Sequence, residues 1–180
     1  MSFKNAIGHF RTITRHRHMV IRHAFKVGIP WRGLMHDLSK YTPTEFGAGI
    51  KYYAGGKYSA NENERKALGY SKAWVHHKGR NRHHFEYWTD YIPHTKKLMP
   101  IKMPKKFVIE MFCDRVAASK IYQGKEYTTS HPLEYFMRSK GTRFIHPETS
   151  DYIEKLLTML RDEGEKATFR YIRKTRKEDY

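Results

Sequence analysis

The sequence predicts an all-α fold. Apolar residues recur at spacings of three and four residues over most of the chain, as they do along one face of a helix. Glycine and proline residues fall between these segments, where helices end and begin. We find no run with the clean polar and apolar alternation of a strand, and no Asn-Gly pair that would close a β-hairpin. Together these observations favour a bundle of helices.

The first two helices are predicted over residues 3–27 and 30–40. A stripe that includes histidines marks the first of them, and its members are spaced by three or four residues: His9, Ile13, His16, Val20, His23 and Val27. Gly28 is predicted to end this helix and Pro30 to begin the next, in the usual placement of these two residue types. The stripe therefore turns two or three histidines toward the interior.

The middle of the chain is predicted to be partly irregular. Residues 41–46 indicate a turn into a helical stretch, and residues 47–64 are rich in Gly, Tyr, Asn and Lys without a clear period, which indicates a loop. A helical pattern follows, with one stripe made of Ala67, Tyr70, Trp74 and His77. Residues 93–104 carry three prolines around a basic stretch, and we expect them to be irregular.

The C-terminal half is predicted to contain three further helices. The longest runs over residues 104–124, and its inward stripe places Asp114 where an apolar core residue would normally lie. A buried carboxylate without a partner is costly, so Asp114 should meet a cation, a metal ion or several hydrogen-bond donors. Helices over residues 130–140 and 147–163 follow.

Length and composition limit the class of protein. A chain of 180 residues suits one domain, which we place at residues 1–165, followed by a basic C-terminal helix or tail at residues 166–180 that should fray. Lys and Arg number 35 against 18 Asp and Glu, and the net charge of +17 favours an anionic partner. The single cysteine excludes an intramolecular disulfide, and we find neither a signal peptide nor an apolar run of membrane-spanning length. We therefore expect a cytoplasmic protein.

A metal site is predicted around the adjacent pair His36 and Asp37. Neighbouring helical residues point about 100° apart, so an object between helices is needed to engage both side chains. Further donors occupy inward or paired positions: His16, His23, His77, His83, His84 and Asp114. Imidazole and carboxylate together suit divalent Mn, Fe, Co, Ni or Zn, and carboxylate also tolerates Mg. We predict one or two divalent metal ions per chain, held between facing helices.

This constellation resembles the HD-domain superfamily of metal-dependent phosphohydrolases, and the resemblance implies an HD-domain-like helical bundle. In that superfamily a histidine, a His-Asp doublet and a late aspartate chelate one metal ion, which here implies His16, His36, Asp37 and Asp114. Expanded members hold a second metal with extra histidines, which implies His77 together with His83 or His84. Lys40 matches the position of a phosphate-facing lysine.

A narrower similarity covers most of the chain, from about Phe10 to Phe169. The run from His36 to Phe46, and the spaced residues after it, look like an uncharacterised bacterial and phage family of small HD-like proteins (DUF5662-like): His77, Asn81, His83, His84, Glu86, Tyr87 and Trp88. That family supplies no established activity. His16 precedes His36 by only 20 positions, a short gap for the superfamily, so the first ligand stays open among three residues: His9, His16 and His23.

Several of these residues also have a plain structural explanation. His77 either binds metal or caps and packs a helix, and Asn81 either binds substrate or ends a helix. Lys40 either faces phosphate or is a solvated residue at a helix end. Arg115 is a further candidate for binding substrate. Two residues are candidates for orienting the ligands through hydrogen bonds: His23 and Glu86.

The favoured function is metal-assisted hydrolysis of a phosphate ester, with a nucleotide as the expected substrate. The metal would lower the pKa of a bound water, with Asp37 as a ligand near that water and Lys40 neutralising the phosphate. Two alternatives stay open. A basic nucleic-acid-binding module with a structural metal would explain the charge, including that of residues 170–177. A di-iron HD-type oxygenase would use the same ligands for oxidation.

Overall fold

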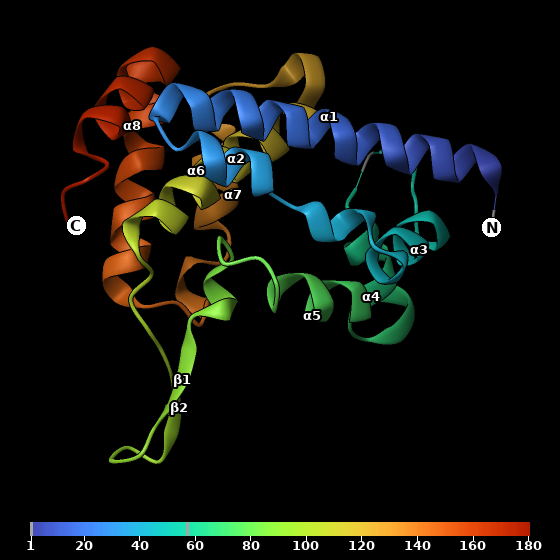
Figure 1. The fold of residues 1–180 in the computed structure, drawn as a ribbon, viewed down its shortest axis with the longest axis horizontal. Helices are drawn as coiled ribbons and strands as arrows, with labels where there is room; N and C mark the ends of the chain where they lie inside the picture. Colours follow the sequence, from blue (N-terminus) through green and yellow to red (C-terminus); the bar gives the residue numbers. More distant parts are fainter. Residues whose placement is uncertain (1, 57) are drawn as a thin grey trace.

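The computed structural model describes residues 2–56 and 58–180, and its fold is all-α, as the sequence predicts (Figure 1). The α-helices in these residues are α1 (Phe3–Val27), α2 (Pro30–Met35), α3 (Pro43–Lys51), α4 (Ala60–Leu68), α5 (Lys72–Lys78), α6 (Lys105–Gln123), α7 (His131–Met137) and α8 (Pro147–Thr175). Short 3-10 helices lie between them: η1 (Leu38–Tyr41), η2 (Phe85–Tyr87), η3 (Gly124–Glu126) and η4 (Lys140–Thr142). Two strands lie between η2 and α6: β1 (Thr89–Ile92) and β2 (Lys97–Pro100).

The hydrophobic core is centred on α6. This helix packs against α1, α7 and α8, and its buried residues face every direction around its axis: Phe107, Val108, Ile109, Glu110, Met111, Phe112, Cys113, Val116 and Ala117. A helix that is buried all round belongs in the middle of a protein. The neighbouring helices contribute further core side chains, among them Val20 and Val27 of α1 and Leu156, Leu157 and Leu160 of α8. Because Asp114 also lies on α6, the fold carries a carboxylate close to the interior.

The structure confirms the first predicted helix, over residues 3–27, and the start of the second at Pro30. The helix α1 ends at Gly28, whose φ of +83° is the left-handed conformation that glycine adopts without strain, and Pro30 opens α2. Gly33 lets α2 approach α1 closely, because a Cβ there would lie only 2.5 Å from Cβ of Ala24. The two helices are thus held together just before the His36–Asp37 doublet.

The expectation that the basic segment 93–104 is irregular holds for residues 93–96 and 101–104, but it is wrong for residues 97–100, which form a strand. Strands β1 and β2 form an antiparallel hairpin in which Thr89 pairs with Pro100 and Ile92 with Lys97. The hairpin projects from the helical body (Figure 1), and neither strand contains a buried residue. A strand without a buried face has no reason to alternate polar and apolar residues, so its sequence lacked the pattern used to find strands.

The loop expected over residues 47–64 is also largely wrong. Helix α3 continues to Lys51 and α4 begins at Ala60. Gly49 is part of α3, where a Cβ would lie 2.0 Å from Nε2 of His9 on α1. The glycine therefore serves the close approach of two helices, and composition alone could not distinguish this use from a turn.

The helical pattern predicted from Ala67 to His77 is divided between two helices. Helix α4 ends at Leu68, Gly69 takes a left-handed φ of +79°, and α5 begins at Lys72. Ser71 caps α5, because its hydroxyl accepts a hydrogen bond from the backbone N–H of Trp74. The apolar spacing runs across this break, so the period alone did not reveal it.

The C-terminal residues, for which a fraying helix or tail was expected, continue α8 as far as Thr175. Gly164 interrupts the helix with a φ of +78° and a ψ of 174°. The last residue, Tyr180, stacks on Tyr152 with ring centroids 4.5 Å apart. Residues on both sides of position 165 therefore contact the same core, and Phe169 and Ile172 belong to it.

Candidate metal centre

The His36–Asp37 doublet lies in a break between α2 and η1. Asp37 takes a left-handed conformation with a φ of +53°, so the continuous helix predicted over residues 30–40 is wrong at the doublet. This conformation costs most L-residues roughly 1–2 kcal/mol, and aspartate tolerates it because its short side chain can form local hydrogen bonds. The turn brings Nε2 of His36 to 3.2 Å from Oδ2 of Asp37, although adjacent helical side chains diverge.

The first group of candidate ligands comes from α1, from the turn and from α6: His16, His36, Asp37 and Asp114. One donor atom of each lies within 4.8 Å of the others. Oδ1 of Asp114 is 2.9 Å from Nε2 of His16 and 3.6 Å from Nε2 of His36. His9, an alternative first ligand, packs instead on Phe46 with ring centroids 5.4 Å apart. The fold thus brings His16 to the predicted position.

A second group shares Asp37 and adds histidines from α5 and the segment after it: Asp37, His77, His83 and His84. Oδ1 of Asp37 lies 3.3 Å from Nε2 of His77 and 3.4 Å from Nε2 of His83. Its other oxygen, Oδ2, faces His36 of the first group. The sequence left open whether His83 or His84 belongs to the site, and the structure places both of them in this group. A carboxylate between two ligand groups suits a centre with two metal ions.

Two carboxylates that the sequence analysis missed hold the imidazoles in place. Oε1 of Glu110 is 3.1 Å from Nδ1 of His36 and 3.2 Å from Nδ1 of His83. Oε2 of Glu45 is 2.7 Å from Nδ1 of His77. A carboxylate on one ring nitrogen fixes the orientation of the ring and leaves the other nitrogen for metal. Glu110 also lies close enough to both imidazoles to act as a ligand itself.

The sequence contains a signal for one of these carboxylates. Glu110 precedes Asp114 by four residues on α6, which is about one helical turn, so an inward Asp114 places Glu110 on the same side. Glu45 has no such signal. It lies in the first turn of α3, which is the ordinary place for an acidic residue that stabilises a helix.

The donor atoms that face one another make no aligned hydrogen bond with any described residue. These six buried atoms are Nε2 of His16, His36, His83 and His84 and both carboxylate oxygens of Asp37. Two of the six have a charged neighbour, since Oδ1 of Asp114 lies 2.9 Å from Nε2 of His16 and Nζ of Lys40 lies 2.6 Å from Oδ2 of Asp37. An unsatisfied buried polar atom costs about 1–3 kcal/mol, and native proteins rarely leave several together. The nitrogen and oxygen types match the ligands that divalent transition metals take. The residues therefore fit a metal centre.

Some of the donors have the protonation state that a metal ligand needs. Burial lowers the pKa of His16 and of His84, which keeps both imidazoles neutral near pH 7. Burial alone would raise the pKa of Asp37, but the positive charges of His36 and Lys40 outweigh it and hold that pKa well below its usual range. Burial alone would lower the pKa values of His36 and His77, but the charge of Asp37 outweighs it and raises both. Metal binding would therefore release protons from these two imidazoles, whereas His16, His84 and Asp37 would bind without losing one.

Lys40 and Asp114 mark the side of the centre that is open to solvent. Nζ of Lys40 forms an ion pair with Oδ2 of Asp37 at 2.6 Å, while 28% of the lysine side chain stays exposed. The Asp114 side chain is 19% exposed, against 3% for Asp37. An anion that approaches from solvent would therefore meet Lys40 first.

The other predicted residues surround the centre. The side-chain amide of Asn81 donates hydrogen bonds to Oγ of Ser39 and to the carbonyl of His77, so it ties η1 to α5. Arg115 follows Asp114 on α6, and its Nε is buried without a hydrogen-bond partner among the described residues. Glu86 likewise has a buried Oε2 without such a partner.

Replacing Glu110 with glutamine is expected to weaken metal binding by about 10- to 100-fold, the usual effect of losing a partner that orients a ligand. One carboxylate oxygen of Glu110 serves both His36 and His83, and Oε2 accepts a hydrogen bond from Nε of Arg32. A glutamine amide has only one oxygen, so it cannot accept hydrogen bonds both from the imidazoles and from Arg32. Competition with a chromophoric chelator measures the affinity. Glu64→Gln is the control, because Glu64 is also a buried carboxylate but binds Ser71; equal affinities in the two variants would contradict the role of Glu110.

His23, expected to support a ligand, lies outside the ligand groups. It packs on Phe169 with ring centroids 5.3 Å apart, and its Nδ1 is 3.4 Å from the carbonyl oxygen of Cys113. Burial, together with the charge of Lys120, lowers the pKa of His23 from 6.5 to about 4. Its role in the structure is therefore that of a neutral core residue.

The low pKa of His23 makes the fold sensitive to acid. The unfolded chain binds more protons than the folded one between pH 6.5 and pH 4, so stability falls as the pH falls through that window, by about 3 kcal/mol. The His23→Gln variant should not show this part of the loss of stability in acid. Urea unfolding at pH 7 and pH 4 measures it, with His18→Gln, an exposed histidine of α1, as the control. The same pH dependence in wild type and His23→Gln would contradict the prediction.

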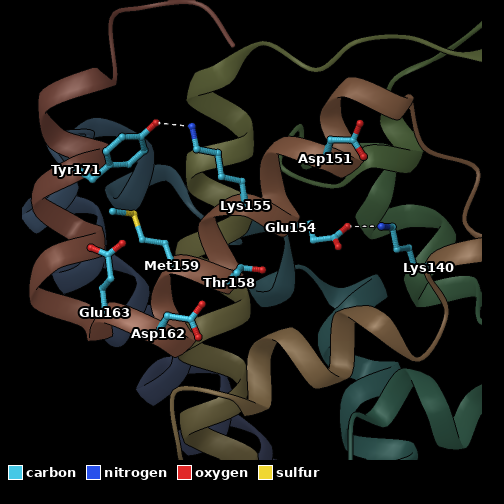
Figure 2. Close-up of a pocket in the computed structure, with 9 residues that line it drawn as sticks. All are labelled: Lys140, Asp151, Glu154, Lys155, Thr158, Met159, Asp162, Glu163 and Tyr171. Atoms are coloured by element: carbon cyan, nitrogen blue, oxygen red, sulfur yellow. Dashed lines mark hydrogen bonds and ion pairs between the residues drawn. The ribbon is translucent and has the colours of Figure 1, made fainter.

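A groove on the outer face of α8 is separate from this centre (Figure 2). Acidic and basic residues line it, together with three other side chains: Lys140, Asp151, Glu154, Lys155, Thr158, Met159, Asp162, Glu163 and Tyr171. Figure 2 shows two of its lysines engaged, one with Glu154 and one with the hydroxyl of Tyr171. None of the candidate ligands lines this groove.

Comparison with known protein families gives one match, which covers most of the chain. Residues 5–159 match a family described as Family of unknown function (DUF5662). The matched stretch contains every candidate ligand, from His16 to Asp114. No curated protein and no solved structure shows significant similarity to the chain. Within the described residues, no helix has both the length and the apolar character needed to cross a membrane.

Proposed function

Because the chain belongs to DUF5662, a family of unknown function, we propose its function from the metal centre itself: it is a metal-dependent phosphohydrolase. The family match bears out the narrower resemblance found in the sequence. We extend the proposal to membership of the HD-domain superfamily. It is supported by a histidine, a His-Asp doublet and a late aspartate meeting in one ligand group.

The convergence of six buried donor atoms that make no aligned hydrogen bond with the described residues carries the proposal. Two divalent ions would be held there, one by His16, His36, Asp37 and Asp114 and the other by Asp37, His77, His83 and His84. When bound, they supply Lewis acidity, which activates water for attack and stabilises negative charge on phosphoryl oxygens.

The chain's own residues would orient and neutralise the substrate. Asp37 presents one carboxylate oxygen to each ligand group and so aligns them. Lys40 is positioned to neutralise a phosphate group that enters from solvent. Arg115, with its free Nε, and Asn81 are the proposed further contacts to the substrate. The net charge of +17 draws anions toward the protein, which supports a phosphorylated substrate such as a nucleotide.

A nucleic-acid-binding module is the second candidate, and the surface of α1 favours it. This helix contains no acidic residue, and it exposes five lysine and arginine side chains along its length: Lys4, Arg11, Arg15, Arg22 and Lys26. Such a stripe suits contacts with a phosphate backbone. In this case the metal would have a structural role. A di-iron oxygenase is the third candidate, supported by the two ligand groups that share Asp37.

Metal content and phosphate release together test the proposal. Protein purified without chelator should contain about two metal ions per chain by elemental analysis, and it should release phosphate from members of a nucleotide panel. His36→Ala should lose both properties, since His36 belongs to the first ligand group. His18→Ala is the matched control, because His18 is an exposed histidine of α1 and should keep both.

Each of the other possible results of these experiments would support a different conclusion. Unchanged metal content in a folded His36→Ala variant would overturn the metal centre. Salt-dependent binding of DNA or RNA without any phosphate release would favour the binding module. Two iron ions per chain without phosphate release would favour the oxygenase. Circular dichroism of each variant shows whether the fold is kept.

A further inference from the structure

Two guanidinium groups lie on the same aromatic ring, and one of them belongs to the residue that follows Asp114. Cζ of Arg143 is 4.3 Å and Cζ of Arg115 is 5.4 Å from the centroid of Phe136, a fully buried ring of α7. Arg115 belongs to α6, directly after Asp114, and Arg143 lies between η4 and α8. Because α7 packs against both α6 and α8, it brings together two cations that are 28 positions apart in the sequence.

Neither arginine forms an ion pair with a carboxylate in residues 2–56 and 58–180. Arg143 donates one hydrogen bond, to the carbonyl of Tyr135 at 3.4 Å, and Arg115 contacts Sδ of Met111 at 4.0 Å. Nε of Arg115 and Nη1 of Arg143 are buried and have no hydrogen-bond partner among those residues. Each guanidinium therefore retains an N–H group with nothing described to accept it.

The two cations also repel each other. Burial, together with the charge of Arg115, lowers the pKa of Arg143 to about 10. Glu86 acts on both arginines from a distance, and its own buried Oε2 has no partner in the described part of the chain. An anion between the arginines would accept their free N–H groups and offset the repulsion. Guanidinium groups suit phosphate because their donors match its oxygens.

We propose that Arg115 and Arg143 form an anion-binding subsite for a second phosphate group of the substrate, next to the phosphate that is hydrolysed. The subsite deepens the proposed function and rests on it. It narrows the substrate to a molecule with at least two linked phosphate groups. Arg115 follows Asp114 on α6, so the subsite would share this helix with a candidate ligand, and Lys40 would meet the first phosphate.

Non-hydrolysable probes test the subsite without any turnover. Isothermal titration calorimetry of the full chain, as purified, would compare methylenediphosphonate with methylphosphonate, which has a single phosphonate group. Arg143→Gln should weaken the binding of methylenediphosphonate by about 10- to 100-fold, the range for losing charge-assisted hydrogen bonds. It should leave the binding of methylphosphonate within about twofold of wild type, because a single group can bind at the metal centre.

Arg138→Gln is the matched control, because Arg138 is an exposed arginine at the end of α7 and its loss changes the net charge equally. Arg143→Lys keeps the charge without the paired donors and should fall between wild type and Arg143→Gln. Equal effects of Arg138→Gln and Arg143→Gln, or no selective loss of methylenediphosphonate, would overturn the subsite. These results do not depend on phosphate release, so failure of the hydrolase proposal would be seen separately in the nucleotide panel.

Discussion

Replacing Asp37 with asparagine is expected to remove metal from both ligand groups and to abolish phosphate release. Asp37 is the one residue that both groups share, with Oδ1 toward His77 and His83 and Oδ2 toward His36. A neutral amide offers one weak donor in place of two charged oxygens. Loss of metal catalysis removes several kcal/mol of transition-state stabilisation, which corresponds to about 10³-fold or more in rate.

Asparagine is the informative substitution because of the backbone. Position 37 has a φ of +53°, and asparagine tolerates this left-handed conformation almost as well as aspartate, whereas alanine would add strain. Elemental analysis and phosphate release measure the result. Asp90→Asn, an exposed aspartate of the hairpin, is the control and should behave as wild type. Two metal ions per chain in folded Asp37→Asn would show that Asp37 is not a shared ligand.

Removing the metal is expected to lower the free energy of unfolding substantially. A ligand that binds only the folded chain at a thousand times its Kd stabilises it by about 4 kcal/mol per site. For a chain of this length, that corresponds to roughly 10 °C in Tm. The physical source is the set of six buried donors without aligned hydrogen bonds among the described residues. Without metal, only two of them have a charged neighbour at 2.9 Å or less, Nε2 of His16 beside Asp114 and Oδ2 of Asp37 beside Lys40.

Differential scanning calorimetry with and without chelator measures this loss of stability, followed by addition of Mn²⁺, Co²⁺ or Zn²⁺. Asp37→Asn provides the control, since it should show no response to metal or chelator. Equal Tm values for chelator-treated and metal-loaded wild type would contradict the prediction. They would also leave the six unsatisfied donors without an explanation.

The helical elements with a long inward stripe could be predicted from the sequence, and so could the candidate ligands on them. His16 lies on the stripe of α1 and Asp114 on that of α6, and both reach the centre as predicted. The periodicity works here because a long helix must bury one face against its neighbours. The presence of the His-Asp doublet was equally visible, and its chemistry suggested metal.

Features decided by tertiary contacts were not predicted. No glycine in the sequence indicates the helix break at position 37, because an aspartate takes the left-handed conformation there. The β1–β2 hairpin has no buried residue and so no alternation. Gly49 was mistaken for a loop residue because its use, contact with His9, depends on how α3 meets α1. Glu110 was missed although it lies about one helical turn from Asp114.

The wide spacing of the ligands has a consequence for how the protein assembles. His16 and Asp114 are separated by nearly a hundred positions, yet they contact each other at 2.9 Å. In the unfolded chain that loop is open, so the complete set of donors exists only after α1 has docked on α6. Metal would therefore bind late on the folding pathway. It should prolong the lifetime of the native state against unfolding while leaving the folding rate largely unchanged.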